Sequence, residues 1–171
     1  MHEVVLALAL LAEAPAVTMK LTSTAFTHQG AIPARLTCDG TNVSPPLAWS
    51  DAPAGTKSFA LIVTDPDAPD PKQPKTTWVH WVLYDIPADA KGFGEAMKTL
   101  PPGTLEGAND WGKTGYGGPC PPIGRHRYVH TLYALDTVLK DLDRPTRTAL
   151  LAAMDKHVLA SVELIGTYQR P

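Results

Sequence analysis

Four short runs of this sequence consist mainly of β-branched, aromatic and other apolar residues, and turn-forming residues separate them. These residue types favour β-strands, so we expect strands at 58–65, 77–85, 127–135 and 162–168. Two of the runs are apolar on both alternating faces, which is typical of strands in a sheet that is covered on each side. Weaker strands are expected at 20–23 and 34–37. The pattern predicts a mainly β fold.

Helical periodicity is confined to the end of the chain. In 145–159 the apolar residues fall at helical spacing, and Pro145 suits the first helical position. The stripe consists of Leu150, Leu151, Met154, Val158 and Leu159. Strands first and a helix late indicate a β fold with peripheral helices.

Length, composition and charge restrict the class of protein. The chain has 171 residues, which suits one domain, and 44% hydrophobic residues, which is ordinary for a globular protein. It carries 15 basic and 17 acidic residues, and no basic run points to a nucleic-acid partner. Seventeen prolines cluster with glycine in loops. The longest such loop, 101–125, carries Asn109, Trp111 and Tyr116, and we expect it to be ordered and to serve binding.

The N-terminus allows two interpretations. Residues 4–12 are wholly apolar, as in a signal peptide, but the preceding MHE contains no Lys or Arg. The run is also far shorter than the ~20 residues of a membrane span. We expect residues 1–18 to be an uncleaved extension before a domain at 19–171, and the protein to be cytoplasmic. The alternative is a periplasmic or secreted protein, if residues 1–16 act as a signal peptide.

Cys38 and Cys120 both lie in turn-rich loops, TCDG and GPCPP. Two reduced thiols are ordinary in a cytosolic protein, whereas loops of this kind also make a bridge easy. Both an intrachain disulfide and two free thiols remain open. Two cysteines without a spacing pattern do not indicate a zinc site.

Strand alternation places ionisable groups near strand ends. In 77–85, Trp78 and His80 share a face with Val82 and Tyr84, opposite Val79, Trp81 and Leu83. In the third strand, His126, Tyr128 and His130 share a face, and Arg127 points the other way. Asp65 ends the first strand. If these ends are neighbours, Asp65, His80 and His126 meet in a pocket, and His130 is a structural bystander.

Four motifs in this order carry a family resemblance: DPDAP at 65–69, WVHW at 78–81, GYGGPCPP at 115–122 and GRHRY at 124–128. The chain resembles the phosphatidylethanolamine-binding proteins, also called Raf kinase inhibitor proteins. CDGTNVSPPLAW at 38–49 and HVLASVELIGTY at 157–168 resemble the bacterial and archaeal branch. The resemblance runs from about residue 19 to 170. It implies a large antiparallel sheet packed on a smaller one, with helices at the edges.

The resemblance also implies a small pocket for phosphate, acetate or the phosphoryl head of phosphoethanolamine. Carried over by motif, the ligand-binding residues are Asp65, Asp67, Pro69, Trp78, His80, Gly118, Pro119, His126 and Tyr128. Two positions differ from the animal members: Arg125 precedes the HRY histidine, and 75–77 reads KTT. No cofactor or metal is implied. A kinase or protease partner and a homodimer are further expectations from the resemblance.

The residue types suit an anion. His80 and His126 can each donate an N–H, Tyr128 a hydroxyl, and the amides near Gly118 can approach closely because glycine has no side chain. A cis Gly118–Pro119 bond would turn these groups inward. Asp65 would orient a histidine. We expect Asp67 and Arg127 to form a charge pair behind the pocket.

Three other functions are compatible with some of these residues. Asp, two His and Tyr could run acid–base hydrolysis, but no Ser or Cys has the setting of an activated nucleophile, so we expect a protein that is not an enzyme. Two His and a carboxylate could bind a metal, but the two histidines concerned, His80 and His126, do not stand at HxH or HxxxH spacing. A module that inhibits a kinase or protease through the pocket rim is compatible with anion binding.

Overall fold

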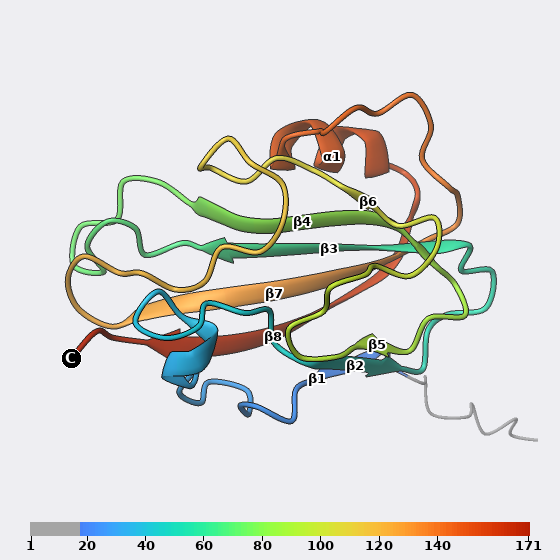
Figure 1. Cartoon of the computed structure of the whole chain (residues 1–171). Coiled ribbons are helices and arrows are strands. Elements are labelled where there is room, and N and C mark those ends of the chain that lie inside the picture. Colours follow the sequence, from blue (N-terminus) through green and yellow to red (C-terminus); the bar gives the residue numbers. More distant parts are fainter. Residues whose placement is uncertain (1–17) are drawn as a thin grey trace, which may run out of the picture.

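The computed structural model describes residues 18–171 and shows two antiparallel β-sheets (Figure 1). The larger sheet has the strand order β6-β4-β3-β7-β8, and the smaller has the order β1-β2-β5. The strands are β1 Lys20–Thr22, β2 Leu47–Ser50, β3 Ser58–Asp65, β4 Trp78–Pro87, β5 Gly92–Phe93, β6 Leu105–Glu106, β7 His126–Leu135 and β8 Val158–Tyr168. This confirms the predicted mainly β fold. Apart from Thr18, the predicted extension 1–18 lies outside the described residues.

The four main strand predictions are confirmed, with shifted ends for three of them. β3 has the predicted bounds, while β8 begins at Val158 rather than at residue 162. The expected strand at 34–37 is wrong, because Ala34–Leu36 forms a 3₁₀ helix, η1. Pro33 fixes the backbone at its start, and the N–H of Leu36 closes the turn by donating to the Pro33 carbonyl over 2.9 Å.

The late helix is present, but it is shorter than expected. Helix α1 spans Arg147–Met154, and the hydroxyl of Thr146 caps it by accepting a backbone N–H of the first turn. Pro145 therefore precedes the cap and is not the first helical residue.

The C-terminal end of the predicted helix is also wrong. Lys156 has a positive φ of 66°, which stops the helical path. Val158 and Leu159 then belong to β8, where both are exposed, so they contribute nothing to the apolar face of α1.

The large sheet is covered on both faces, as the apolar strands predict. All residues of β3 are buried at the centre of that sheet. On one face the small sheet packs against it, with a core that includes Leu21, Leu47, Trp49, Phe59, Leu61, Trp81 and Phe93. On the other face lies α1 (Figure 1), with a core of Ala60, Ile62, Val79, Val82, Tyr84, Leu135, Leu139, Leu150 and Met154.

A bulge in β4 changes which side chains share a face. Val63 of β3 pairs with Trp81 and the next residue pairs with Val79, so His80 is an extra residue without a partner on β3. The predicted face of Trp78, His80, Val82 and Tyr84 is therefore wrong beyond the bulge. Val82 and Tyr84 join the core under α1, and Trp81 turns to the small-sheet side, where His80 also packs.

The long Gly/Pro loop is ordered and lies along β4. The side chain of Asn109 holds it, because its oxygen accepts the N–H groups of Trp111 and Lys113 and its nitrogen donates to the Gly115 carbonyl, each over 3.1 Å. The backbone N–H of Gly117 donates to the carbonyl of His80 over 3.0 Å. This contact carries the loop across the bulge and places it beside the strand ends.

Candidate functional site

Asp65 stands at the end of β3, and its carboxylate shapes the turn that follows. Oδ1 accepts the backbone N–H of Asp67 over 2.8 Å, the usual way in which Asp stabilises a turn. The cis peptide bond lies in this turn, between Ala68 and Pro69. The predicted cis bond at Gly118–Pro119 is wrong.

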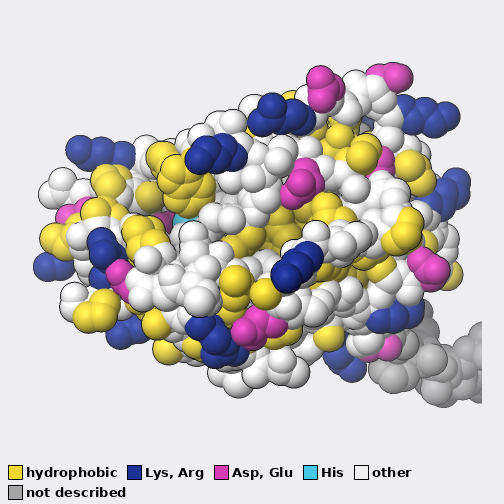
Figure 2. Space-filling view, viewed as in Figure 1, with side chains coloured by type: hydrophobic (Ala, Val, Ile, Leu, Met, Phe, Trp, Pro, Cys, Tyr) yellow, Lys and Arg dark blue, Asp and Glu magenta, His cyan; other side chains and the backbone are white. Residues whose placement is uncertain are grey.

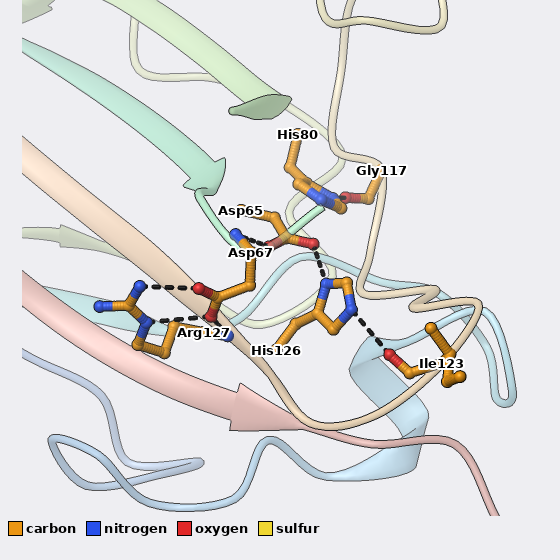
Figure 3. Close-up of polar contacts among 7 residues, drawn as sticks. All are labelled: Asp65, Asp67, His80, Gly117, Ile123, His126 and Arg127. Carbon is orange, nitrogen blue, oxygen red and sulfur yellow. Dashed lines mark hydrogen bonds and ion pairs between the residues drawn. The ribbon is translucent and has the colours of Figure 1, made fainter. Parts of the chain in front are cut away.

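The other oxygen of Asp65 bonds to His126 at the start of β7 (Figure 3). The distance from Oδ2 to Nδ1 of His126 is 2.7 Å, and Nε2 of the same ring lies 2.9 Å from the Ile123 carbonyl. Both neighbours are acceptors, and a histidine ring donates from both nitrogens only as the cation. The His126 side chain is 0% exposed and that of Asp65 is 5% exposed, so this ion pair is almost entirely buried.

A second ion pair lies behind the first. Asp67 accepts two bonds from the Arg127 guanidinium, of 2.9 and 2.7 Å, and one from the Arg127 backbone N–H. Asp67 is buried, and hydrogen bonds from Arg127 hold the pKa of its carboxyl below the usual range. The predicted Asp67–Arg127 pair is confirmed. We refer to Asp65, Asp67, His126 and Arg127 together as the ion-pair wall.

His80 faces these pairs from β4 and uses its ring differently. Nδ1 donates to the Gly117 carbonyl over 2.7 Å, and the ring meets those of Tyr128 and Trp111 edge-on, with centroids 5.2 and 5.1 Å apart. Burial lowers the pKa of His80, although the Gly117 carbonyl and the carboxylates of Asp65 and Asp110 oppose this. A neutral His80 therefore keeps its proton on Nδ1 and has Nε2 available to a ligand.

Between these two sides lies a cavity of about 340 Å³. It is lined by Asp65, Ala68, Pro69, Trp78, His80, Trp111, Cys120, Pro121 and Pro122. We call it the His80 cavity, and Trp78, His80 and Trp111 its aromatic wall. Trp111 packs edge-on against both other members. The indole N–H of Trp78 is buried and meets no acceptor within residues 18–171.

Four of the nine predicted ligand-binding residues line this cavity: Asp65, Pro69, Trp78 and His80. The other five do not line it, although Gly118 lines an adjoining cavity. Asp67 and His126 are engaged in the ion pairs, and Tyr128 touches the His80 ring, with its pKa raised by burial and by the Asp65 carboxylate. That the nine residues bind an anion stays a prediction.

Gly118 and Pro119 serve the backbone of the loop. The Gly118 N–H donates to Oδ1 of Asn42 over 2.8 Å, so it does not point to an anion as expected. A side chain at this position would clash, because a Cβ would lie 2.4 Å from the Leu36 carbonyl oxygen. The Pro119 carbonyl accepts the N–H of Cys38 over 3.0 Å, which ties this loop to the turn after η1.

A disulfide joins the same two segments. The structure links Cys38 and Cys120, with Cα atoms 5.4 Å apart, so of the two open interpretations it has the bridge. Cys120 lies in the cavity lining, as do Pro121 and Pro122. Sequence reasoning did not assign these residues to the site, nor Ala68 or Trp111. In the sequence, the composition of the loop 101–125 drew attention to Trp111, but it did not indicate that this side chain lines the cavity.

Two further features were sought among the described residues: a metal-binding group of side chains and a membrane-spanning helix. Within residues 18–171, no group of three or more His, Cys, Asp or Glu side chains could hold a metal ion. In the same range, no helix has both the length and the apolar character needed to cross a membrane.

Comparisons with known proteins agree on one family. Residues 22–169 match the family model described as phosphatidylethanolamine-binding protein. A UPF0098 protein of Methanothermobacter thermautotrophicus is 48% identical over 155 residues, which cover 89% of this chain and 99% of the relative.

Two solved structures support the same result. A phosphatidylethanolamine-binding protein homologue from Chlamydia trachomatis has 41% identity and a TM-score of 0.84, covering 91% of this chain and 99% of its own. Escherichia coli YbcL has 31% identity and a TM-score of 0.81, covering 90% and 99%.

Proposed function

We propose, on the premise that this chain belongs to the phosphatidylethanolamine-binding protein family, that the His80 cavity binds a small oxyanion of single negative charge. Acetate and monoprotonated phosphoryl groups are of this class. The observation that carries the proposal is the hydrogen bond from Nδ1 of His80 to the Gly117 carbonyl, which fixes the ring so that Nε2 is left for a ligand.

The charges around the cavity favour a single negative charge over two. Asp65 is balanced by His126, and Asp67 by Arg127. Within residues 18–171, no Lys or Arg lines the cavity. Sites for phosphoryl dianions usually gather several cationic donors. One histidine is enough to offset one charge.

A proton accompanies the anion in this proposal. His80 is neutral near pH 7 because burial lowers its pKa, so its Nε2 cannot donate until it gains a proton. A bound acetate would supply the opposite charge that favours the cation. Asp65 and Asp110 also face the ring and favour protonation, and His130, whose pKa burial lowers to about 4, is uncharged at this pH and does not oppose it. Acetate affinity should thus fall about tenfold for each pH unit above the pKa of His80.

Calorimetric titration with acetate between pH 6 and 8, in buffers of different ionisation enthalpy, tests this directly. We expect uptake of about one proton per acetate bound. The matched variant is His80→Asn, because an asparagine amide can replace Nδ1 at the Gly117 carbonyl but has no group at the position of Nε2. It should bind acetate at least about tenfold more weakly and take up no proton. Binding that is independent of pH, or equal in the variant, would contradict the proposal.

We further propose that the site binds its ligand without turnover. In the described chain the cavity lining contains no Ser or Thr, and its cysteine is in the disulfide. Both oxygens of Asp65 already accept hydrogen bonds, so it is poorly placed as a general base. The alternative is a hydrolase that uses Asp65 and His80. Turnover of phosphoester or ester substrates that His80→Asn abolishes would establish that alternative.

A protein partner would use the same cavity. The kinase or protease suggested by the resemblance would present an anionic group to His80. Capture of such a partner by the wild type, but not by His80→Asn, would support this role, and equal capture would exclude the cavity from it.

A further inference from the structure

Three cavities adjoin on one face of the molecule. The His80 cavity shares Trp111 and Cys120 with a second cavity of about 320 Å³. That cavity, which we call the Asn42 cavity, shares Asn42 and Tyr116 with a third of about 620 Å³, the Trp81 cleft. Neighbours in this series share wall residues, so the three cavities lie side by side from His80 to Trp81, and we refer to them together as the groove.

The chemistry of the wall changes along the groove. The Asn42 cavity is the most polar of the three, and its wall includes Asn42, Asn109, Lys113, Thr114, Gly117 and Gly118. The Trp81 cleft has an apolar floor of Val43, Trp81, Met97, Leu100 and Tyr116, with Lys98 and Glu106 also in its wall. Figure 2 shows a hydrophobic hollow at the centre of this face, between a basic and an acidic side chain. An occupant must match an anion site, a polar passage and an apolar cleft, in that order.

One detail points to a ligand beyond the anion. Lys113, on the polar passage, is exposed and forms no ion pair with any other described residue. An occupant with backbone carbonyls or a negative charge at this point would complement it.

We propose that this groove binds the C-terminal segment of an extended peptide. Its terminal carboxylate lies at His80, its backbone crosses the Asn42 cavity, and a large apolar side chain a few residues before the terminus fills the Trp81 cleft. The placement of the carboxylate rests on the proposed function, whereas the passage and the cleft are observations of their own.

The polar passage distinguishes a peptide from a lipid. An acyl chain running from His80 to the Trp81 cleft would lay methylene groups along Lys113 and Thr114, whose polar groups would lose water without gaining partners. A peptide backbone brings N–H and carbonyl groups that can pair there. The wall of the His80 cavity, without Lys or Arg in the described chain, favours a carboxylate over a phosphorylated side chain.

Fluorescence anisotropy with labelled hexapeptides tests the proposal. The series places one Phe two, three or four residues before the C-terminus in an Ala/Ser background, each as free acid and as amide. We expect one spacing to bind about ten- to hundredfold tighter than the same peptide with Ala in place of Phe, because a buried aromatic side chain contributes that much. The amide of that peptide should lose at least about tenfold.

The variant for the cleft is Leu100→Glu, with Met97→Glu as a second, since both side chains are only partly buried. Leu105→Glu is the matched control, because Leu105 is an exposed leucine that lines none of the three cavities. We expect both cleft variants to remove the gain from Phe while acetate affinity is unchanged. Leu105→Glu should change neither, and circular dichroism should show all three folded.

The outcomes separate the two proposals. If acetate binds but Phe gives no gain at any spacing, the groove is not a peptide site and the anion proposal stands. If Phe gives a gain that the cleft variants remove while acid and amide bind equally, the terminal carboxylate is not at His80. Tighter binding of a phosphoserine peptide of the same spacing, or of phosphatidylethanolamine vesicles, would overturn the choice of partner.

Discussion

The two histidines of the site lie near the starts of β4 and β7, the strands on either side of β3, yet they differ in every property that decides their role. His126, on the ion-pair wall, has both ring nitrogens bonded within the protein and no exposed surface. His80, on the aromatic wall, uses one nitrogen and lines the cavity with the rest of its ring. Both ring nitrogens of His126 are bonded without a ligand, whereas His80 keeps one ring nitrogen that can donate to a ligand or accept from it.

This difference separates stability from binding. Removing part of a closed network leaves a buried charge without a partner, which is costly. Removing a group that faces a cavity costs the fold little. We therefore expect changes to the ion-pair wall to act on the free energy of unfolding, and changes to His80 to act on ligand affinity.

The largest expected effect is from Asp65→Ala. It removes the carboxylate that accepts from His126 and from the turn, and it should lower the free energy of unfolding by about 3–5 kcal/mol. Urea unfolding at pH 7 measures this. Asp65→Asn is the matched control, since it keeps the acceptor for the turn and should lose less. A loss below about 1 kcal/mol for Asp65→Ala would mean that the ion-pair wall is not the closed network described.

Removal of the disulfide tests the other side of the site. Cys38 and Cys120 are 82 residues apart in sequence, and a bridge over a loop of this length contributes about 2–4 kcal/mol. The Cys38→Ala/Cys120→Ala variant should lose this amount in urea unfolding, and the wild type should match it after reduction. Unchanged stability in wild-type protein whose thiols are shown to be reduced would contradict the prediction.

The same bridge bears on the compartment. Disulfides persist mainly in oxidising compartments, whereas most cytosols keep thiols reduced. Counting free thiols in protein taken directly from cells would choose between the cytoplasmic expectation and the exported alternative.

Arg127→Met should have an intermediate effect. The guanidinium makes two bonds to the buried Asp67, but its side chain is 56% exposed, so water offsets part of the loss. We expect a loss of about 1–2 kcal/mol in the free energy of unfolding and a change of less than about twofold in acetate affinity. A larger effect on affinity than on stability would contradict the assignment of Arg127 to the ion-pair wall.

How far the sequence predicts the site depends on how regular each strand is. On β7, simple alternation correctly buried His126, Tyr128 and His130 and placed Arg127 on the opposite face. On β4, the extra residue at His80 reversed the faces of Val82 and Tyr84. A bulge of this kind has no glycine or proline to mark it, so alternation alone could not reveal it.

The remaining parts of the site depend on contacts between distant loops. Trp111 reaches the cavity because Asn109 folds its loop back on itself and Gly117 pairs with β4. The same folding of the loop brings Cys120 next to Cys38. Residue types in 101–125 predicted an ordered loop, but which side chains face the cavity follows from three-dimensional packing.

The smallest expected effect on stability is from His80→Asn, and its pH dependence is its most informative property. The variant keeps a donor for the Gly117 carbonyl, so at pH 7.5 the loss should be at most about 1 kcal/mol. Burial lowers the pKa of His80 in the folded protein, so below about pH 6.5 the unfolded state binds a proton that the folded state resists. Wild-type stability should therefore fall with acid more steeply than that of the variant.

Urea unfolding of both proteins at pH 7.5, 6.5 and 5.5 measures this difference. Saturating acetate should reduce it in the wild type alone, because the bound anion favours the protonated ring. His130, whose pKa burial lowers to about 4, adds an acid-sensitive contribution in both proteins; it largely cancels in the comparison, because the charge of His80 is the smallest cause of that shift. Parallel curves, with and without acetate, would mean that folding does not lower the pKa of His80 and that acetate does not bind beside its ring, and the contrast between the two walls would be lost.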